Sequence, residues 1–178
     1  MRWLIDGYNL IRSDPELAAA ERASLEAGRA ALCRALAPMA RGGSEEFTVV
    51  FDGAGRGGEG GAIAGVRVVF SSARESADRV LARLAVKGGT VVSNDRDVQR
   101  AAVRAGAIAV SANQFLARLD RLRKSSPEVE ASGGGDEGDD VPRGVKKGNP
   151  RRLGKKARAA ARALGRLGAG PEGRWSGR

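Results

Sequence analysis

The chain has 178 residues and a formal charge of +10, with one cysteine and no histidine. This composition excludes a disulfide within the chain, a cysteine-clustered zinc site and any chemistry that needs imidazole as base, nucleophile or metal ligand. The length suits one domain with an appendage, and no apolar run approaches the roughly 18 residues of a membrane-spanning helix. We therefore expect a cytoplasmic protein that has no membrane partner.

The first ten residues combine an apolar run with an acid at its end. Trp3, Leu4 and Ile5 have the continuous apolar pattern of a strand that is covered on both faces, and Asp6 stands where this run stops. In open α/β sheets, ligands collect at the carboxyl ends of the strands. Asp6 is therefore a candidate functional residue. The alternative is a purely structural Asp-Gly turn, since this dipeptide is common in turns.

Strands and helices are expected to alternate along the next hundred residues. After the first strand, the pattern predicts a helix that starts at 13–15 and ends before Pro38 or at 42–43. The seven glycines between residues 53 and 65 predict a mobile loop. The other strands are expected at 47–51, 66–70, 90–93 and 107–110, and the other helices at about 75–87, 97–105 and 113–124. This alternation favours right-handed crossovers and a central parallel sheet of about five strands.

The composition divides the chain into three parts, namely a domain over 1–124, an acidic and glycine-rich linker over 125–142, and a basic tail over 143–178. Ten basic residues and no acidic one lie between positions 143 and 166, which favours a polyanionic partner, nucleic acid rather than membrane. Residues 153–167 have a helical pattern, but their apolar residues are mostly alanine. We expect this helix to be unstable in isolation and the tail to be flexible and removable without unfolding the domain.

Five acids follow the expected strands or begin the expected helices, and a parallel sheet would bring them to one rim: Asp6, Asp52, Asp78, Asp95 and Asp97. Crowded carboxylates persist near neutral pH by raising their pKa values or by holding cations. A donor set made only of oxygen selects Mg²⁺ or Mn²⁺, which can activate water for phosphodiester hydrolysis. The structural alternatives are a helix-dipole role for Asp78 and an N-cap role for Asp95.

Other phosphate chemistries lack their motifs in this chain. No Gly-x-x-x-x-Gly-Lys-Ser/Thr loop is present, which excludes a P-loop nucleotidase. The glycines after Asp52 run into more glycine rather than into a helix, unlike a dinucleotide-binding turn. A phosphoaspartyl hydrolase would need an acid two residues after its nucleophile, and that place is Tyr8.

Four motifs, in order, resemble the NYN-domain proteins of the YacP type, which are PIN-like bacterial ribonucleases that include a ribosome-associated messenger-RNA endonuclease. The motifs are Ile5 to Leu10, Val50 to Gly53, Glu75 to Val80 and Val92 to Asp97, and the likeness covers about residues 1–122. The resemblance implies a PIN-like three-layer α/β/α domain. It also implies Mg²⁺- or Mn²⁺-dependent cleavage of RNA, with the ribosome as an expected setting.

The resemblance also assigns residues. Asp6, Asp78 and Asp95 match its metal-site acids, with Asp52 as a further candidate ligand, and Asp97 and Asn9 are expected to orient waters or ligands. The basic tail is not matched by the resemblance, and its candidate contacts to nucleic acid follow from its charge. The full set of candidate contacts is Ser93, Asn94, Arg96, Lys146, Lys147, Arg151, Arg152, Lys155 and Lys156. Two alternatives stay open from the residues alone: an RNA- or ribosome-binding module of nuclease-like fold without cleavage activity, and a nuclease that acts on DNA.

Overall fold

The computed structural model describes residues 1–42, 45–53, 56–125 and 154–168. Within these residues the chain forms one six-stranded sheet of order β3-β4-β2-β1-β5-β6, which is parallel except for β3. The strands are β1 Arg2–Asp6, β2 Glu46–Phe51, β3 Arg56–Ile63, β4 Val66–Ser72, β5 Thr90–Val92 and β6 Ile108–Val110. The helices are α1 Gly7–Arg12, α2 Pro15–Ala23, α3 Leu25–Arg41, α4 Ala77–Ala85, α5 Arg96–Arg104, α6 Ala112–Ser125 and α7 Lys155–Arg166.

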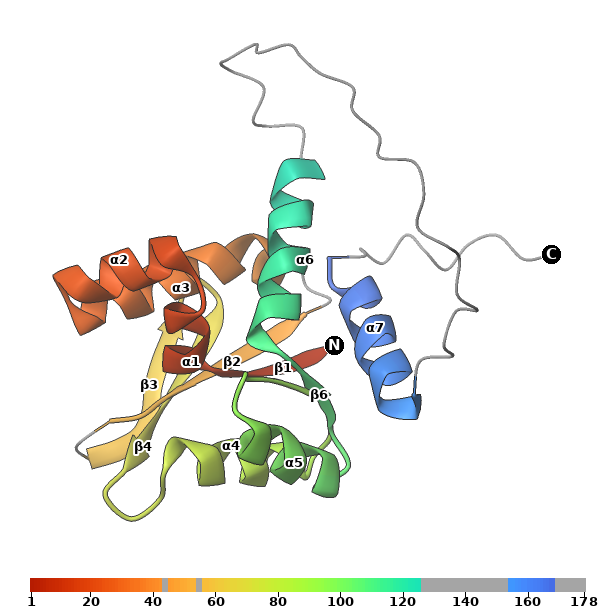
Figure 1. Cartoon of the computed structure of the whole chain (residues 1–178). Coiled ribbons are helices and arrows are strands. Elements are labelled where there is room, and N and C mark those ends of the chain that lie inside the picture. The colour runs from red at the N-terminus through yellow and green to blue at the C-terminus, as the bar shows by residue number, and fades with distance from the viewer. Residues whose placement is uncertain (43–44, 54–55, 126–153, 169–178) are drawn as a thin grey trace, which may run out of the picture.

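The sheet lies between two layers of helices (Figure 1). Alternate residues of the strands point to opposite faces, so that Trp3 and Ile5 pack beneath α1, α2, α3 and α6, while Leu4 packs against α4 and α5. The two resulting cores explain why the strands have continuous apolar runs. The expected three-layer α/β/α fold is confirmed, and none of the helices in the described ranges is long and apolar enough to cross a bilayer.

The strand order places a crevice beside β1. From β1 the chain adds β2 and then β4 on one side, and it later adds β5 and β6 on the other side. In doubly wound sheets, ligands bind outside the carboxyl ends of the strands where the direction of winding reverses. Here the reversal lies between β1, which ends at Asp6, and β5, which is followed by Ser93.

The prediction of a mobile glycine-rich loop is wrong for residues 56–63, which form the antiparallel edge strand β3. Its pairing with β4 uses backbone groups, which a glycine-rich segment retains. A Cβ at Gly60 would lie 2.5 Å from the Phe70 ring, so the missing side chain allows β3 to lie close against this ring. The sequence-based expectation failed because hydrophobic periodicity cannot detect a strand in which half of the residues are glycine.

The single long helix expected from 13–15 onward is two helices, α2 and α3, and the short helix α1 before it was not predicted. Ser24 has extended backbone angles and its hydroxyl accepts a hydrogen bond from the Ala27 amide, which ends α2 and begins α3. Gly28 allows the two helices to approach, because a Cβ there would lie 2.9 Å from Cα of Glu21. The helix α3 also continues through Pro38 to Arg41 instead of ending before this proline.

The helix expected in the tail is present as α7, but it is not a free element. Ala160, Ala163 and Leu167 are buried in the core cluster beneath α6 and beside β6. Arg118 of α6 donates a hydrogen bond of 2.8 Å to the Leu167 carbonyl and so satisfies the C-terminal end of α7. The part of the predicted flexible tail that the structure describes is therefore docked on the domain, whereas residues 126–153 and 169–178 lie outside the described residues.

Candidate active site

A cleft of about 740 Å³ opens at the carboxyl ends of β1 and β2. Acidic residues from three elements line it, namely Asp6 after β1, Asp52 after β2 and Asp78 in the first turn of α4. The other lining residues are Tyr8, Asn9, Arg12, Ser13, Leu25, Arg29, Gly53, Ser76 and Ala77. Three of the five acids that were predicted to gather therefore line this cleft, whereas Asp95 and Asp97 do not line it.

Asp6 joins β1 to the segment after β5. Its Oδ1 accepts a hydrogen bond of 3.3 Å from the Asn9 amide, which makes Asp6 the N-cap of α1. Its Oδ2 accepts a hydrogen bond of 2.9 Å from the hydroxyl of the buried Ser93. The next residue, Gly7, is required for close packing, because a Cβ there would lie 2.3 Å from the Phe51 ring. Asp6 is therefore a cap and also a fixed carboxylate at the cleft, rather than a residue of a simple Asp-Gly turn.

Asn9 and Asn94 form a second link across the same junction. The Asn9 side-chain oxygen accepts a hydrogen bond of 2.7 Å from the backbone amide of Asn94. The Asn94 side chain donates to Ser13 Oγ at 3.0 Å and to Asn113 Oδ1 at 3.2 Å, and it accepts from the Ala112 amide at 3.0 Å. These bonds fix α1, the end of β5 and the start of α6 relative to one another, so Asn94 is a scaffold residue of the site.

The acids after β5 have structural roles as well as exposed carboxylates. Asp95 caps α5, because its Oδ1 accepts hydrogen bonds from the Asp97 amide at 2.6 Å and the Val98 amide at 3.3 Å. Asp97 is 87% exposed and pairs with Arg100 at 3.5 Å. The N-cap alternative for Asp95 is thus confirmed, and it leaves the carboxylate at the edge of the acid cluster.

Asp52 and Asp78 reach the cleft from the end of β2 and from α4. The buried Ser71 hydroxyl, at the end of β4, donates a hydrogen bond to Asp52 Oδ1. Ser76 rather than Asp78 caps α4, since its hydroxyl accepts from the Arg79 amide at 3.4 Å. The capping requirement of α4 is therefore met without Asp78, whose carboxylate is exposed at the cleft.

The charges of these acids act on one another. Burial is the main cause that raises the pKa of Asp6; the hydrogen bonds from Ser93 and Asn9 oppose it, and the charges of Asp78 and Asp95 raise it further. Burial also raises the pKa of Asp78, and the next causes are the charges of Asp95, Asp52 and Asp97. The cluster thus carries an uncompensated electrostatic cost at neutral pH, which a bound cation would relieve.

The raised pKa of Asp6 predicts how the Asp6→Asn variant responds to pH. Between the unfolded value of about 3.9 and the higher folded value, the native state binds more protons, so this group lowers the stability as the pH rises. Asparagine has no such charge. At pH 7 without metal ions, we expect the melting temperature of the variant to equal or exceed that of the wild type. Any excess over the wild type should shrink as the pH falls toward 4.

Thermal unfolding in EDTA at several pH values measures this difference. Asp120→Asn is a suitable control because Asp120 is an exposed residue of α6 outside the cleft. A variant that is less stable than the wild type at pH 7, with a deficit that grows as the pH rises, would show instead that the Asp6 charge stabilises the fold.

The acid cluster and the strand order can be compared with known proteins. The family model described as the YacP-like NYN domain matches residues 3–143. The chain belongs to the YacP-like NYN domain family. No curated protein matches the chain significantly. The family has a nuclease-like fold, which agrees with a cleft lined by acids at the carboxyl edge of a parallel sheet.

Two solved structures are similar to this YacP-like NYN domain. One is the crystal structure of a single-substitution variant of Rae1 (YacP) from Bacillus subtilis, with 26% identity and a TM-score of 0.59 over 70% of this chain and 77% of that chain. The other is Rae1 (YacP) itself, with 24% identity and a TM-score of 0.57 over 70% of this chain and 76% of that chain. Both likenesses support the fold, and the first also supports the family.

The donor set of this NYN domain fits a hard divalent ion only in part. No group of three or more histidine, cysteine, aspartate or glutamate side chains within the described ranges is close enough together to hold a metal ion. Mg²⁺ is usually held by one or two carboxylates and keeps several waters, so a complete protein cage is not needed. The repelling carboxylates fit an ion of this kind with water between it and some of the acids.

Sequence analysis missed the basic and aromatic wall of the cleft. Arg29 of α3 donates hydrogen bonds from Nε, at 2.9 Å, and from a terminal nitrogen to the Tyr8 hydroxyl. Its guanidinium carbon lies 5.5 Å from the centre of the Tyr8 ring, 5.5 Å from that of Phe51 and 5.0 Å from that of Phe70. Arg12 lies 5.4 Å from the Tyr8 ring centre. In sequence, Arg29 is only one member of an amphipathic helix, so no local signal identified it.

The predicted contacts to nucleic acid have different environments. Ser93 is fully buried and its hydroxyl donates to Asp6, so in this structure it positions a carboxylate, and its contact with phosphate stays a prediction. Arg96, Lys155 and Lys156 are exposed and line another groove, between α5 and α7. Asn94 is held by the bonds described above, and the other four predicted contacts lie outside the described residues: Lys146, Lys147, Arg151 and Arg152.

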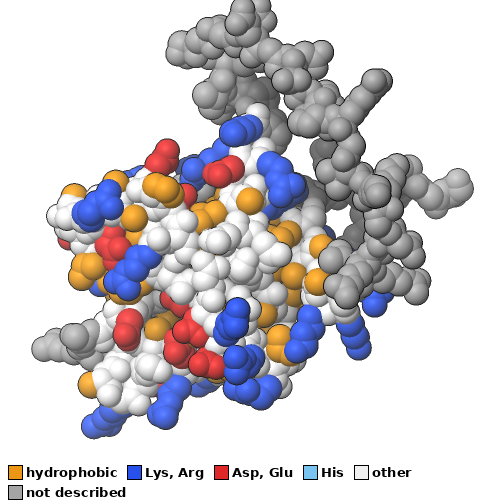
Figure 2. Space-filling view, viewed as in Figure 1, with side chains coloured by type: hydrophobic (Ala, Val, Ile, Leu, Met, Phe, Trp, Pro, Cys, Tyr) orange, Lys and Arg blue, Asp and Glu red, His pale blue; other side chains and the backbone are white. Residues whose placement is uncertain are grey.

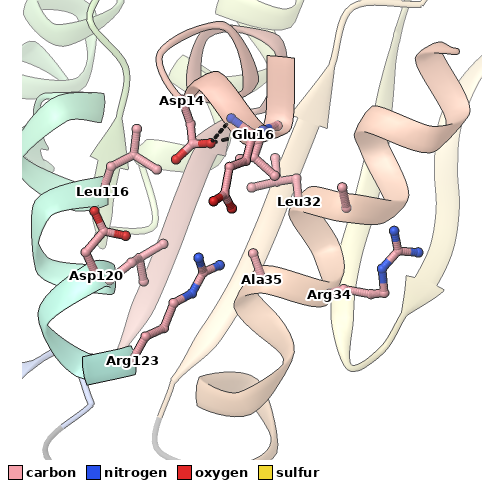
Figure 3. Close-up of a pocket in the computed structure, with 11 residues that line it drawn as sticks. Asp14, Glu16, Leu32, Arg34, Ala35, Leu116, Asp120 and Arg123 are labelled. Atoms are coloured by element: carbon pink, nitrogen blue, oxygen red, sulfur yellow. Dashed lines mark hydrogen bonds between the residues drawn. The ribbon is translucent and has the colours of Figure 1, made fainter. Parts of the chain in front are cut away.

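A smaller pocket of about 320 Å³ lies between α2, α3 and α6 and contains none of the predicted site residues (Figure 3). Asp120 and Arg123 extend from α6 on one side, and Leu32 and Ala35 belong to α3 on the other side. Asp14 accepts two hydrogen bonds of 2.9 Å from the first turn of α2, so its carboxylate serves as a helix cap. None of the five predicted acids of the cluster lines this pocket.

Proposed function

We propose that this NYN domain is a Mg²⁺- or Mn²⁺-dependent endoribonuclease. The observation that supports this most is the cleft at the carboxyl edge of the sheet, which Asp6 at the end of β1, Asp52 after β2 and Asp78 of α4 line together. Membership of a nuclease-like family and a net charge of +10 agree with a polyanionic substrate. The ribosomal setting implied by the resemblance stays a prediction.

The acidic residues of the cleft would bind the metal ion, and the basic residues would bind the substrate. Asp6 and Asp78 would hold the ion, with Asp95 and Asp52 at its edges, and the ion would supply an activated water and neutralise charge on the phosphodiester. Ser93 and Asn9 hold Asp6 in place, whereas Asp97 would orient water at the rim. Arg12 and Arg29, on the other wall, would bind the phosphate oxygens of the substrate.

Incubation of the purified protein with a labelled single-stranded RNA, and with DNA of the same sequence, tests this function. Internal cleavage of RNA that requires Mg²⁺ or Mn²⁺ and stops in EDTA is the expected result. Binding of RNA without cleavage under any metal condition would identify an RNA-binding module of nuclease-like fold. Equal cleavage of both polymers would contradict the assignment to RNA.

The basic wall gives a separate prediction for Arg29→Lys. Lysine keeps the charge but loses the planar fork that bonds the Tyr8 hydroxyl and stacks on the rings. We expect KM for a short RNA to rise by about tenfold, with a smaller effect on kcat. Steady-state cleavage kinetics measure this change, and Arg34→Lys, at an exposed position of the same helix, is the control. An unchanged KM would remove Arg29 from substrate binding.

A further inference from the structure

A second groove, of about 690 Å³, lies between α5, β6, the start of α6 and α7. Four basic residues line it, Arg96 and Arg100 from α5 and Lys155 and Lys156 from α7, and none of its lining residues within the described ranges is acidic. Small and apolar side chains make up most of the remaining lining, namely Val103, Ala107, Ile108, Ala109, Ala157, Ala159 and Ala160, and the polar residues Gln99, Ser111 and Gln114 complete it. The groove therefore offers cations at its rim and an apolar surface between them.

The docking of α7 creates this groove. Leu167 is fully buried, Ala163 is 2% exposed, and Arg118 bonds the last carbonyls of α7. These contacts hold the first turn of α7, with Lys155 and Lys156, facing the basic side chains of α5. The positions of the four cations are thus fixed by packed helices rather than by a free basic tail.

The groove adjoins the carboxylate site. Arg96 follows directly after Asp95, and Arg100 forms an ion pair of 3.5 Å with Asp97. Figure 2 shows acidic side chains gathered on one face of the molecule, with lysine and arginine side chains immediately beside them. A chain of phosphates that occupies the metal site can therefore continue into the groove without leaving the surface.

We infer that this groove between α5 and α7 binds a single strand of the RNA substrate on one side of the scissile phosphodiester. The inference rests on the proposed function and adds a strand-binding subsite to it. Lys155 and Lys156 contact phosphates, and the guanidinium planes of Arg96 and Arg100 stack on unpaired bases above the apolar surface. An acidic segment of a protein matches the charge but has no reason to extend to a site of metal-dependent phosphodiester cleavage.

The test measures RNA binding by the full chain in EDTA, so that it does not depend on cleavage. Fluorescence anisotropy with a labelled single-stranded RNA of about 12 nucleotides, long enough to reach beyond the metal site, reports the affinity. The salt slope is the slope of log affinity against log salt concentration, and each lost phosphate contact reduces its magnitude by about 0.7. At 0.1 M salt this change corresponds to a loss of about fivefold in affinity. We expect Lys155→Ala/Lys156→Ala to bind about 25-fold more weakly, with a reduced salt slope.

Arg104→Ala/Arg162→Ala removes the same charge from exposed positions of α5 and α7 outside the groove and should bind like the wild type. Equal losses in both double variants would overturn the inference in favour of diffuse attraction. If the groove variant binds RNA like the wild type but no longer binds poly-glutamate, the groove is a site for an acidic protein. If the protein cleaves nothing, the binding comparison still decides the inference. If the groove variant binds normally while the wild type cleaves RNA, only the inference fails.

Discussion

Asp78→Asn should lose RNA cleavage by at least about 100-fold while the domain stays folded. Asparagine keeps the shape of the side chain, but it removes the negative charge that would hold the metal ion. This is the same charge that the other acids of the cluster repel. Ser76 supplies the cap of α4, so the helix does not depend on the Asp78 carboxylate. Cleavage of a labelled RNA in Mn²⁺, compared at equal concentrations of folded protein, measures the loss.

Asp120→Asn is the matched control for this substitution, because it removes an exposed helical aspartate far from the cleft. The control should cleave like the wild type. Asp78→Asn protein that unfolds, yet retains wild-type activity in its folded fraction, would show that Asp78 serves the helix start. Activity within a few-fold of the wild type in a stable variant would remove Asp78 from the metal site.

Ala163→Asp should detach α7 from the domain and strongly lower the free energy of unfolding. Ala163 is 2% exposed and lies in the same core cluster as Phe115 and Leu119, so an aspartate there would bury an unpaired charge or displace the helix. Leu167→Ala, which removes a fully buried side chain, should cost about 2–5 kcal/mol. Urea unfolding measures both effects.

Ala161→Asp places the same charge on the exposed side of the same helix and should change the stability by no more than about 0.5 kcal/mol. Equal stability of the two aspartate variants would contradict the docking of α7.

This docking also changes the expectation from sequence that the domain survives removal of the tail intact. A chain shortened to residue 123 would expose the face of the core that α7 covers.

The layers of the fold and the position of the acid cluster were predictable because each depends on a local pattern. Apolar runs that end in an acid, such as those before Asp6 and Asp52, place carboxylates at the rim of any parallel sheet. The cap of α5 at Asp95 is also a local signal. These features need no knowledge of which distant residues meet.

The missed features depend on tertiary contacts. Half of the residues of β3 are glycine, so its side chains show no period, and its stability comes from pairing with β4. The role of Arg29 depends on three rings from α1, β2 and β4 that meet only in the folded chain. Ser93 ends an expected strand and no local pattern shows what it contacts, whereas the fold buries it against Asp6. The helix α7 appeared too poor in large apolar residues to dock, but its alanines allow close approach to β6.

The stabilisation of the protein by Mn²⁺ is the most direct test that these carboxylates form one site. A ligand that binds only the folded state at about 100 times its Kd adds about 2.7 kcal/mol. We predict that Mn²⁺ raises the melting temperature of the wild type, that Asp6→Asn and Asp78→Asn each lose most of this rise, and that the double variant loses no more than either. Rises of equal size in the wild type and both variants would contradict a shared metal site.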